Sequence, residues 1–183
     1  MAGQVRRHPM HGWWVYLTPA MVQEADKVGH MRHENAIEQG RIPGNGGPDP
    51  GWELKVHVIG ALGELGSKQP FDPIVWHKFK RGNLGKLPDL GDFIDVKTPV
   101  PNGKQSLIVK RGGVKPHWAY LLTSGIYHPH YRLIGWMWGE DVLKVPLTCP
   151  RANRPAHVIP EDDKRLRDVR ELVEINRARA QGK

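Results

Sequence analysis

Cysteine is almost missing from this sequence, since Cys149 is the only one among 183 residues. A single cysteine cannot form a disulfide within the chain, so we expect a reducing compartment, namely the cytoplasm, or the host cytoplasm if a virus encodes the chain. Hydrophobic runs long enough to cross a membrane are also missing, and the first residues lack the apolar core of a secretion signal. We therefore expect no membrane partner.

Negative charge is in short supply as well. The chain has 27 Lys and Arg residues against 19 Asp and Glu residues, which gives a formal net charge of +8. Such a balance favours a polyanionic partner, of which nucleic acid is the commonest. No change in composition divides the chain, so we expect one domain over residues 1–183. Within it we expect disordered tails at 1–12 and 178–183 and a flexible loop, rich in glycine and proline, at 40–51.

Hydrophobic periodicity and turn residues predict helices at both ends of the chain and strands between them. The expected helices cover residues 19–39, a segment through Glu64 that ends near Gly66, and a segment that starts directly after Pro160. The expected strands lie at 13–17, at 71–79, around Asp95, and at 106–110, 118–122 and 131–138, with irregular structure at 148–155. This order predicts an α/β fold in which helices flank a mixed central β-sheet.

Residues 88–98, with the sequence PDLGDFIDVKT, bring acids and a lysine together. Successive side chains of a strand alternate between its faces, so Asp95 and Lys97 should project together while Ile94 and Val96 project the opposite way. One face should then carry chemistry, and the other should join the core. An Asp-x-Lys strand is also common as a solvated polar face, and that interpretation stands beside the chemical one.

The turn residues before Phe93 predict a hairpin that brings Asp89 beside Asp95. Carboxylates without neighbouring Cys or His ligands suit Mg2+ or Mn2+. Phosphodiester hydrolysis needs a water that the metal makes more acidic and a positive group where charge grows on the phosphoryl oxygens, and we expect Lys97 to take the second task. The hairpin is short, which leaves Asp92 as a reserve ligand. We favour Asp89, because Asp92 and Asp95 should lie on opposite faces of a strand.

Glu64 lies in a strongly apolar segment of helical periodicity. A carboxylate in such a segment needs a partner, because burying an unpaired charge is costly. Gly60 and Ala61 leave room on the same face for a close neighbour, so we expect Glu64 to join the two aspartates. Arg32, on the helix over 19–39, is expected on a solvated face, with a phosphate contact as the alternative.

The hairpin of residues 88–98 and the preceding Glu64 resemble the motif of the PD-(D/E)xK phosphodiesterase superfamily. The Gly-Ala-x-Gly-Glu helix and a later strand ending near Trp136 are similar to those of small phage-borne and bacterial members. The resemblance covers roughly residues 19–160 by the order of elements. It implies a restriction-endonuclease-like core and an Mg2+-dependent or Mn2+-dependent DNA nuclease, most often an endonuclease. The roles that it implies are metal binding by Glu64, Asp89 and Asp95 and catalysis by Lys97.

Cations surround the hairpin in the sequence, as contacts to a phosphate backbone would require. The candidate DNA-binding residues are Lys78, Lys80, Arg81, Lys86, Lys110 and Arg111. The sequence also leaves a homodimer open.

Two other functions compete with the nuclease. The first is a basic nucleic-acid-binding or assembly protein that keeps the same fold without catalysis. The second is a binding module held by zinc on His128, His130 and Cys149, which is the weaker of the two because the remaining histidines are scattered.

Overall fold

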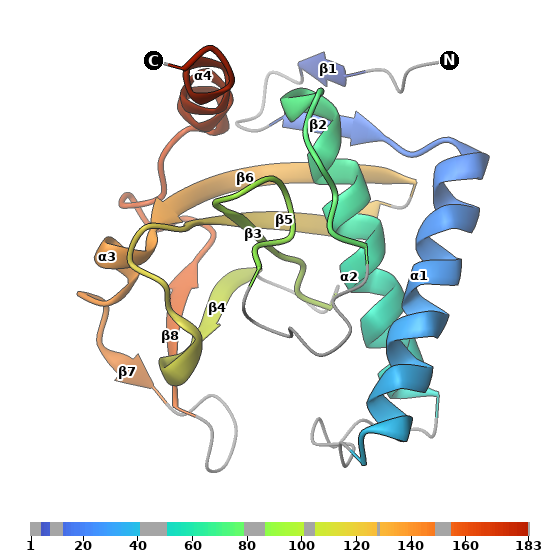
Figure 1. Cartoon of the computed structure of the whole chain (residues 1–183). Coiled ribbons are helices and arrows are strands. Elements are labelled where there is room, and N and C mark those ends of the chain that lie inside the picture. Colours follow the sequence, from blue (N-terminus) through green and yellow to red (C-terminus); the bar gives the residue numbers. More distant parts are fainter. Residues whose placement is uncertain are drawn as a thin grey trace.

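The computed structural model describes residues 5–7, 13–40, 51–78, 87–100, 105–127, 129–148 and 155–182. Its elements run along the chain as shown in Figure 1. In order they are β1 (Val5–Arg7), β2 (Trp13–Tyr16), α1 (Pro19–Glu38), α2 (Trp52–Lys68), the 3-10 helix η1 (Gln69–Phe71), β3 (Ile94–Lys97), β4 (Ser106–Lys110), the 3-10 helix η2 (Arg111–Gly113), β5 (Ala119–Tyr127), β6 (His130–Trp138), α3 (Gly139–Val142), β7 (Leu147–Thr148), β8 (Ala156–Pro160) and α4 (Val169–Ala180).

Two sheets organise these elements. The larger sheet has five strands in the order β1-β2-β6-β5-β3, and the smaller has three in the order β4-β8-β7. Strand β3 runs parallel to β5, whereas the other paired strands of the larger sheet are antiparallel. The predicted α/β class with a mixed sheet and flanking helices is therefore confirmed.

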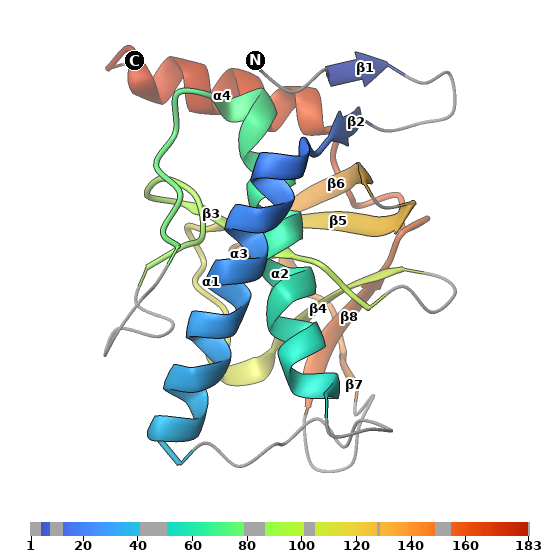
Figure 2. The same ribbon diagram turned by 90° about the vertical axis from the view of Figure 1, so that its right-hand side faces the viewer.

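The larger sheet forms a middle layer between helices and the smaller sheet, with α2 next to the sheet and α1 outside it (Figures 1 and 2). The side chains of β5 alternate between the two faces of the sheet, which explains why the sheet lies between two cores. Ala119 and Leu121 join the core beneath the helices, whereas Tyr120 and Leu122 join a second core shared with β4 and β8. Both faces of β5 are buried over residues 119–124, in agreement with the apolar residues at 119–122.

Local signals define α1 well. Thr18 caps the helix, because its hydroxyl accepts a hydrogen bond from the Met21 amide at 3.3 Å, and Pro19 occupies the first turn. The observed range Pro19–Glu38 confirms the predicted helix at 19–39. The helices approach each other so closely at Gly29 that an added Cβ would lie 2.7 Å from the Val58 Cα.

Helix α2 extends further than predicted. It continues through Gly66 to Lys68, so the expected end near Gly66 was wrong. Gly66 is buried, with Val15 and Leu17 next to the position that a side chain would occupy. The glycine thus serves packing rather than helix termination, and it brings α2 against β2.

The predicted strand at 71–79 was also wrong. Phe71 ends the short helix η1, and the only pairing in the described part of that segment is an isolated bridge between Trp76 and Leu90. Pro70 and Pro73 explain the difference, because proline supplies no amide hydrogen for a ladder. The segment therefore lies beside the 88–98 hairpin but does not form a strand of the sheet.

The C-terminal part differs from its prediction at two points. Residues 156–160 form β8, which was not predicted, and the last helix starts at Val169 rather than directly after Pro160. Asp168 caps this helix by accepting a hydrogen bond from the Arg170 amide at 2.8 Å. The capping aspartate, and not the acids after Pro160, sets the start of α4.

Parts of both expected tails are structured, since β1 lies within residues 1–12 and α4 continues to Ala180. Most of the expected loop, residues 41–50, lies outside the described part of the chain. Within the described part, no helix combines the length and apolar character needed to span a membrane.

Candidate functional site

The 88–98 hairpin begins at a tight turn. Gly91 adopts a positive φ of 57°, a conformation that glycine adopts readily, and the Leu90 amide donates to the Ile94 carbonyl at 2.9 Å. Ile94 and Val96 are buried in the core beneath the helices. Asp95 and Lys97 contact each other on the opposite face, so the predicted alternation is confirmed.

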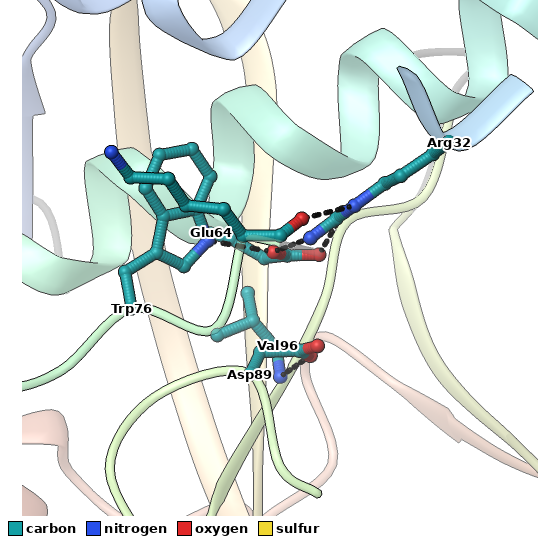
Figure 3. Close-up of polar contacts among 6 residues, drawn as sticks. Arg32, Glu64, Trp76, Asp89 and Val96 are labelled. Carbon is teal, nitrogen blue, oxygen red and sulfur yellow. Dashed lines mark hydrogen bonds and ion pairs between the residues drawn. The ribbon is translucent and has the colours of Figure 1, made fainter. Parts of the chain in front are cut away.

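Two aspartates of this hairpin are buried. Asp89 is 9% exposed, and its Oδ2 accepts a hydrogen bond from the Val96 amide at 2.8 Å across the hairpin (Figure 3). Asp95 is 8% exposed. The side chain of Asp92, by contrast, is 82% exposed and lies 3.9 Å from the Arg179 guanidinium on α4. The turn therefore directs Asp89 toward β3 and Asp92 toward solvent.

Lys97 forms an ion pair with Asp95, and about a third of its side chain, 34%, is exposed. Burial alone would lower the pKa of Lys97, but the negative charges of Asp95 and Asp89 outweigh that effect and hold the pKa well above its usual value. Its ammonium group also lies 6.0 Å from the centre of the Tyr120 ring. Lys97 is thus a fixed positive charge beside two carboxylates.

Glu64 faces the same region from α2, and only 8% of its side chain is exposed. Arg32 of α1 donates from Nη1 to Oε1 and from Nη2 to Oε2, both at 2.7 Å, and the Trp76 indole donates to Oε2 at 2.9 Å (Figure 3). Burial and the negative charge of Asp89 raise the pKa of Glu64, while the donors of Arg32 and Trp76 oppose this shift. The expected close partner of Glu64 is therefore a guanidinium.

Asp89 connects the two ion pairs electrostatically. Its charge raises the pKa of Glu64 on one side and that of Lys97 on the other. The three acids and the two cations, Arg32 and Lys97, have a formal charge of −1 in sum, which favours the approach of a cation. Within the described ranges, however, no three His, Cys, Asp or Glu side chains are grouped so that they could hold one metal ion together.

The predicted DNA-binding cations within the described residues lie in separate parts of the structure. Lys78 lies near the site, where it pairs with Glu24 of α1 and lies 5.6 Å from the Trp76 ring centre. Lys110 and Arg111 are exposed at the end of β4, in the layer of the smaller sheet. Three further candidates, Lys80, Arg81 and Lys86, lie outside the described residues, as do His128 and Cys149 of the zinc alternative.

Sequence reasoning missed two residues of this region. The prediction of a solvated face for Arg32 was wrong, because its guanidinium binds Glu64 and its side chain is only 19% exposed. Trp76 was assigned to a strand, and its hydrogen bond to Glu64 was not foreseen. One signal was available: a buried glutamate needs donors, and arginine is the side chain best suited to bind both of its oxygens.

Comparison of the chain with protein-family models, with curated proteins and with solved structures finds no match.

Proposed function

We propose that this protein is a metal-dependent DNA nuclease that hydrolyses phosphodiester bonds. The observation that carries the proposal is the arrangement at the hairpin, where the partly exposed Lys97 is held beside the buried carboxylates of Asp89 and Asp95. Phosphoryl-transfer sites need carboxylates for a hard cation and a positive group beside the phosphoryl oxygens. Nothing in an ordinary solvated strand face requires two carboxylates to be buried beside a lysine.

Asp89 and Asp95 are the residues that would hold Mg2+ or Mn2+, because carboxylate oxygens are the ligands that these ions prefer. The excess negative charge of the site favours such an ion. When bound, the metal would polarise the phosphate and make a bound water more acidic. The predicted role of Glu64 as a third ligand stays a prediction.

Lys97 would act on the substrate in the same site. In the protein alone, Asp95 holds its ammonium group in place. Because a third of the side chain is exposed, the ammonium group can reach a phosphate that enters the site. There it would stabilise the charge that grows on the phosphoryl oxygens in the transition state.

We further infer a relationship to the PD-(D/E)xK superfamily and a restriction-endonuclease-like core. In support, a mixed sheet carries the acidic hairpin on β3, and a helix with a buried glutamate packs against that strand. The net charge of +8 supports DNA as the partner. A phage-borne origin, action as an endonuclease, a homodimer and the cytoplasm as the compartment belong to the same proposal.

The decisive experiment is incubation of the purified protein with plasmid DNA in Mg2+, in Mn2+ and in EDTA. We expect nicking or linearisation with either metal and none with EDTA. The matched control is Asp95→Asn, which removes one carboxylate charge and keeps the side-chain shape. Equal cleavage by both proteins would contradict the assignment of this site.

One observation favours the non-catalytic alternative. Arg32 and Lys97 already pair with Glu64 and Asp95, which reduces the charge available to a metal. On that alternative the same plasmid would be bound and not cleaved in either metal, and Asp95→Asn would leave DNA affinity unchanged.

A further inference from the structure

The Glu64 carboxylate already has three hydrogen-bond donors. Arg32 binds both oxygens at 2.7 Å, and the Trp76 indole adds a donor to Oε2 at 2.9 Å. Two parallel bonds between a guanidinium and a carboxylate are among the stronger polar contacts in proteins. A metal ion at these oxygens would compete with Arg32, and displacing Arg32 from a buried carboxylate would leave the guanidinium without its partner.

Arg32 also holds the segment that pairs with the hairpin. Its Nε donates to the Lys78 carbonyl at 3.0 Å, so that one guanidinium contacts α2 and residues 76–78 together. Trp76, in the same segment, binds the Glu64 carboxylate. Arg32 thus holds the segment at Lys78, and Glu64 holds it at Trp76.

That segment in turn holds the backbone around Asp89. The His77 amide donates to the Asp89 carbonyl at 2.9 Å, and the His77 ring contacts the Gly91 carbonyl through Nε2 at 2.7 Å. Trp76 forms the bridge with Leu90. A continuous series of contacts therefore runs from Arg32 and Glu64 to Asp89, and every step in it is a hydrogen bond or a backbone pairing.

We propose that Arg32 and Glu64 are a buried positioning pair that holds Asp89 in the orientation needed for catalysis, and that Glu64 is not a metal ligand. This inference depends on the proposed function, because it concerns the same metal site. It assigns the ion to Asp89 and Asp95 alone among the three acids. It also gives Arg32 a role in the site without contact to substrate.

The test compares Mn2+ binding, measured by electron paramagnetic resonance of the free ion, in Arg32→Met, Glu64→Gln and the double variant. The double variant keeps the net charge of the site, because it removes one charge of each sign. We expect it to bind Mn2+ within about threefold of the wild-type affinity, whereas Glu64→Gln alone should bind more weakly because an unpaired guanidinium then lies beside Asp89. A loss of about tenfold or more in the double variant would show that Glu64 is a ligand and overturn the inference.

A second readout separates positioning from a merely structural role. At saturating Mn2+ and varied DNA concentration, kcat of the folded double variant should fall by roughly tenfold or more while KM stays near the wild-type value, because Asp89 is displaced from its working position. An unchanged kcat would contradict the positioning role. Circular dichroism establishes that the variant is folded.

Trp76→Phe provides the same test if the double variant does not fold. It removes the indole donor to Glu64 and keeps an aromatic ring at this core position. We expect unchanged Mn2+ affinity with a reduced kcat. A raised Mn2+ affinity would identify Glu64 as a ligand freed from a competing donor, and would overturn the inference.

The variants Asp89→Asn and Asp95→Asn show whether a negative result contradicts only the inference about Glu64 or the proposed metal site as a whole. Weaker Mn2+ binding in both variants supports the metal site, whatever the double variant does. If the wild-type protein and both Asn variants bind Mn2+ equally, the metal site and the inference that depends on it are both wrong.

Discussion

At the scale of single residues, Asp89 and Asp92 lie in the same turn but have different surroundings. Asp89 is buried and accepts the Val96 amide, whereas the Asp92 side chain is 82% exposed. We expect Asp89→Asn to eliminate metal-dependent cleavage. Asp92→Asn should retain it, with a change in unfolding free energy within about 0.5 kcal/mol, as for most surface substitutions. Plasmid cleavage and thermal melting of both variants decide the assignment, and an inactive Asp92→Asn beside an active Asp89→Asn would reverse it.

Lys97 should be needed for the chemical step and not for binding. We expect Lys97→Met to abolish cleavage and to leave most DNA affinity in place, because a contact made in the transition state adds little to ground-state binding. Lys144→Met is the matched control, since the Lys144 side chain on the other side of the larger sheet is 73% exposed. Cleavage by Lys97→Met at the wild-type rate would remove Lys97 from the mechanism.

Lys97 should also affect alkaline stability. Burial alone would lower its pKa, but Asp95 and Asp89 raise it above the unfolded value of 10.5. The ion pair therefore stabilises the fold fully below pH 10.5, and this contribution is lost as the pH rises through the folded pKa. Melting temperature should accordingly fall more steeply above pH 10.5 in the wild-type protein than in Lys97→Met.

Titration of Tyr131 does not disturb that comparison. Burial raises the pKa of Tyr131 to about 12, so this group loses its proton at high pH in both proteins. The difference between the melting curves belongs to Lys97 and to Tyr120, because the Lys97 charge lowers the pKa of Tyr120 against the larger effect of burial. Parallel curves would show that the ion pair with Asp95 adds nothing to stability.

The sequence alone correctly predicted the environment of residues that depends on their near neighbours in the chain. Alternation along β3 correctly placed Ile94 and Val96 in the core and Asp95 with Lys97 on the other face. It was not sufficient for Arg32, whose partner is far away in the chain and on another helix. A helical pattern shows which residues share a face, but not whether a buried acid on a second helix lies opposite that face.

At the scale of elements, two glycines of α2 offer a matched pair. A Cβ at Gly63 would lie 1.9 Å from the Thr98 hydroxyl, whereas nothing lies within 4 Å of one at Gly60. We expect Gly63→Ala to separate α2 from β3 and to cost about 1–3 kcal/mol of unfolding free energy. Gly60→Ala should stabilise the protein by about 0.5–1 kcal/mol, because alanine favours a helix interior.

Chemical denaturation of both variants measures these effects. Removing the obstacle should restore part of the lost stability, so Gly63→Ala combined with Thr98→Ala should be more stable than Gly63→Ala alone. Equal stability of the Gly60 and Gly63 variants would show that the approach of α2 to β3 is not tight.

Elements with complete local signals were predicted well. The capped helix α1 and the apolar strand β4 agree with the sequence interpretation to within one residue at either end. The segment at 71–79 was assigned to a strand on its apolar residues alone, and within its described part only an isolated bridge between Trp76 and Leu90 forms. The start of α4 was placed too early because acids suit a helix start without defining it, whereas a capping side chain does define it.

At the scale of the whole molecule, the net charge of +8 should appear in the salt dependence of DNA binding. Each contact between a cation and a phosphate contributes about −0.9 to the slope of log affinity against log salt for duplex DNA. We expect Lys110→Met to reduce the steepness of that slope by about one, and Lys144→Met to leave it unchanged. Fluorescence anisotropy over a salt series measures both slopes, and an affinity that does not change with salt would exclude DNA as the main partner.

The division of β5 between two cores has a consequence for how this chain tolerates insertions and deletions. Its odd-numbered positions Ala119 and Leu121 serve one core, and the even-numbered Tyr120 and Leu122 serve the other. Loss of a single residue within β5 would exchange the two sets and place each side chain in a space shaped for the other. Indels should therefore be selected against in this strand more strongly than substitutions, and a library of single-codon deletions across the chain would reveal β5 as a continuous intolerant block.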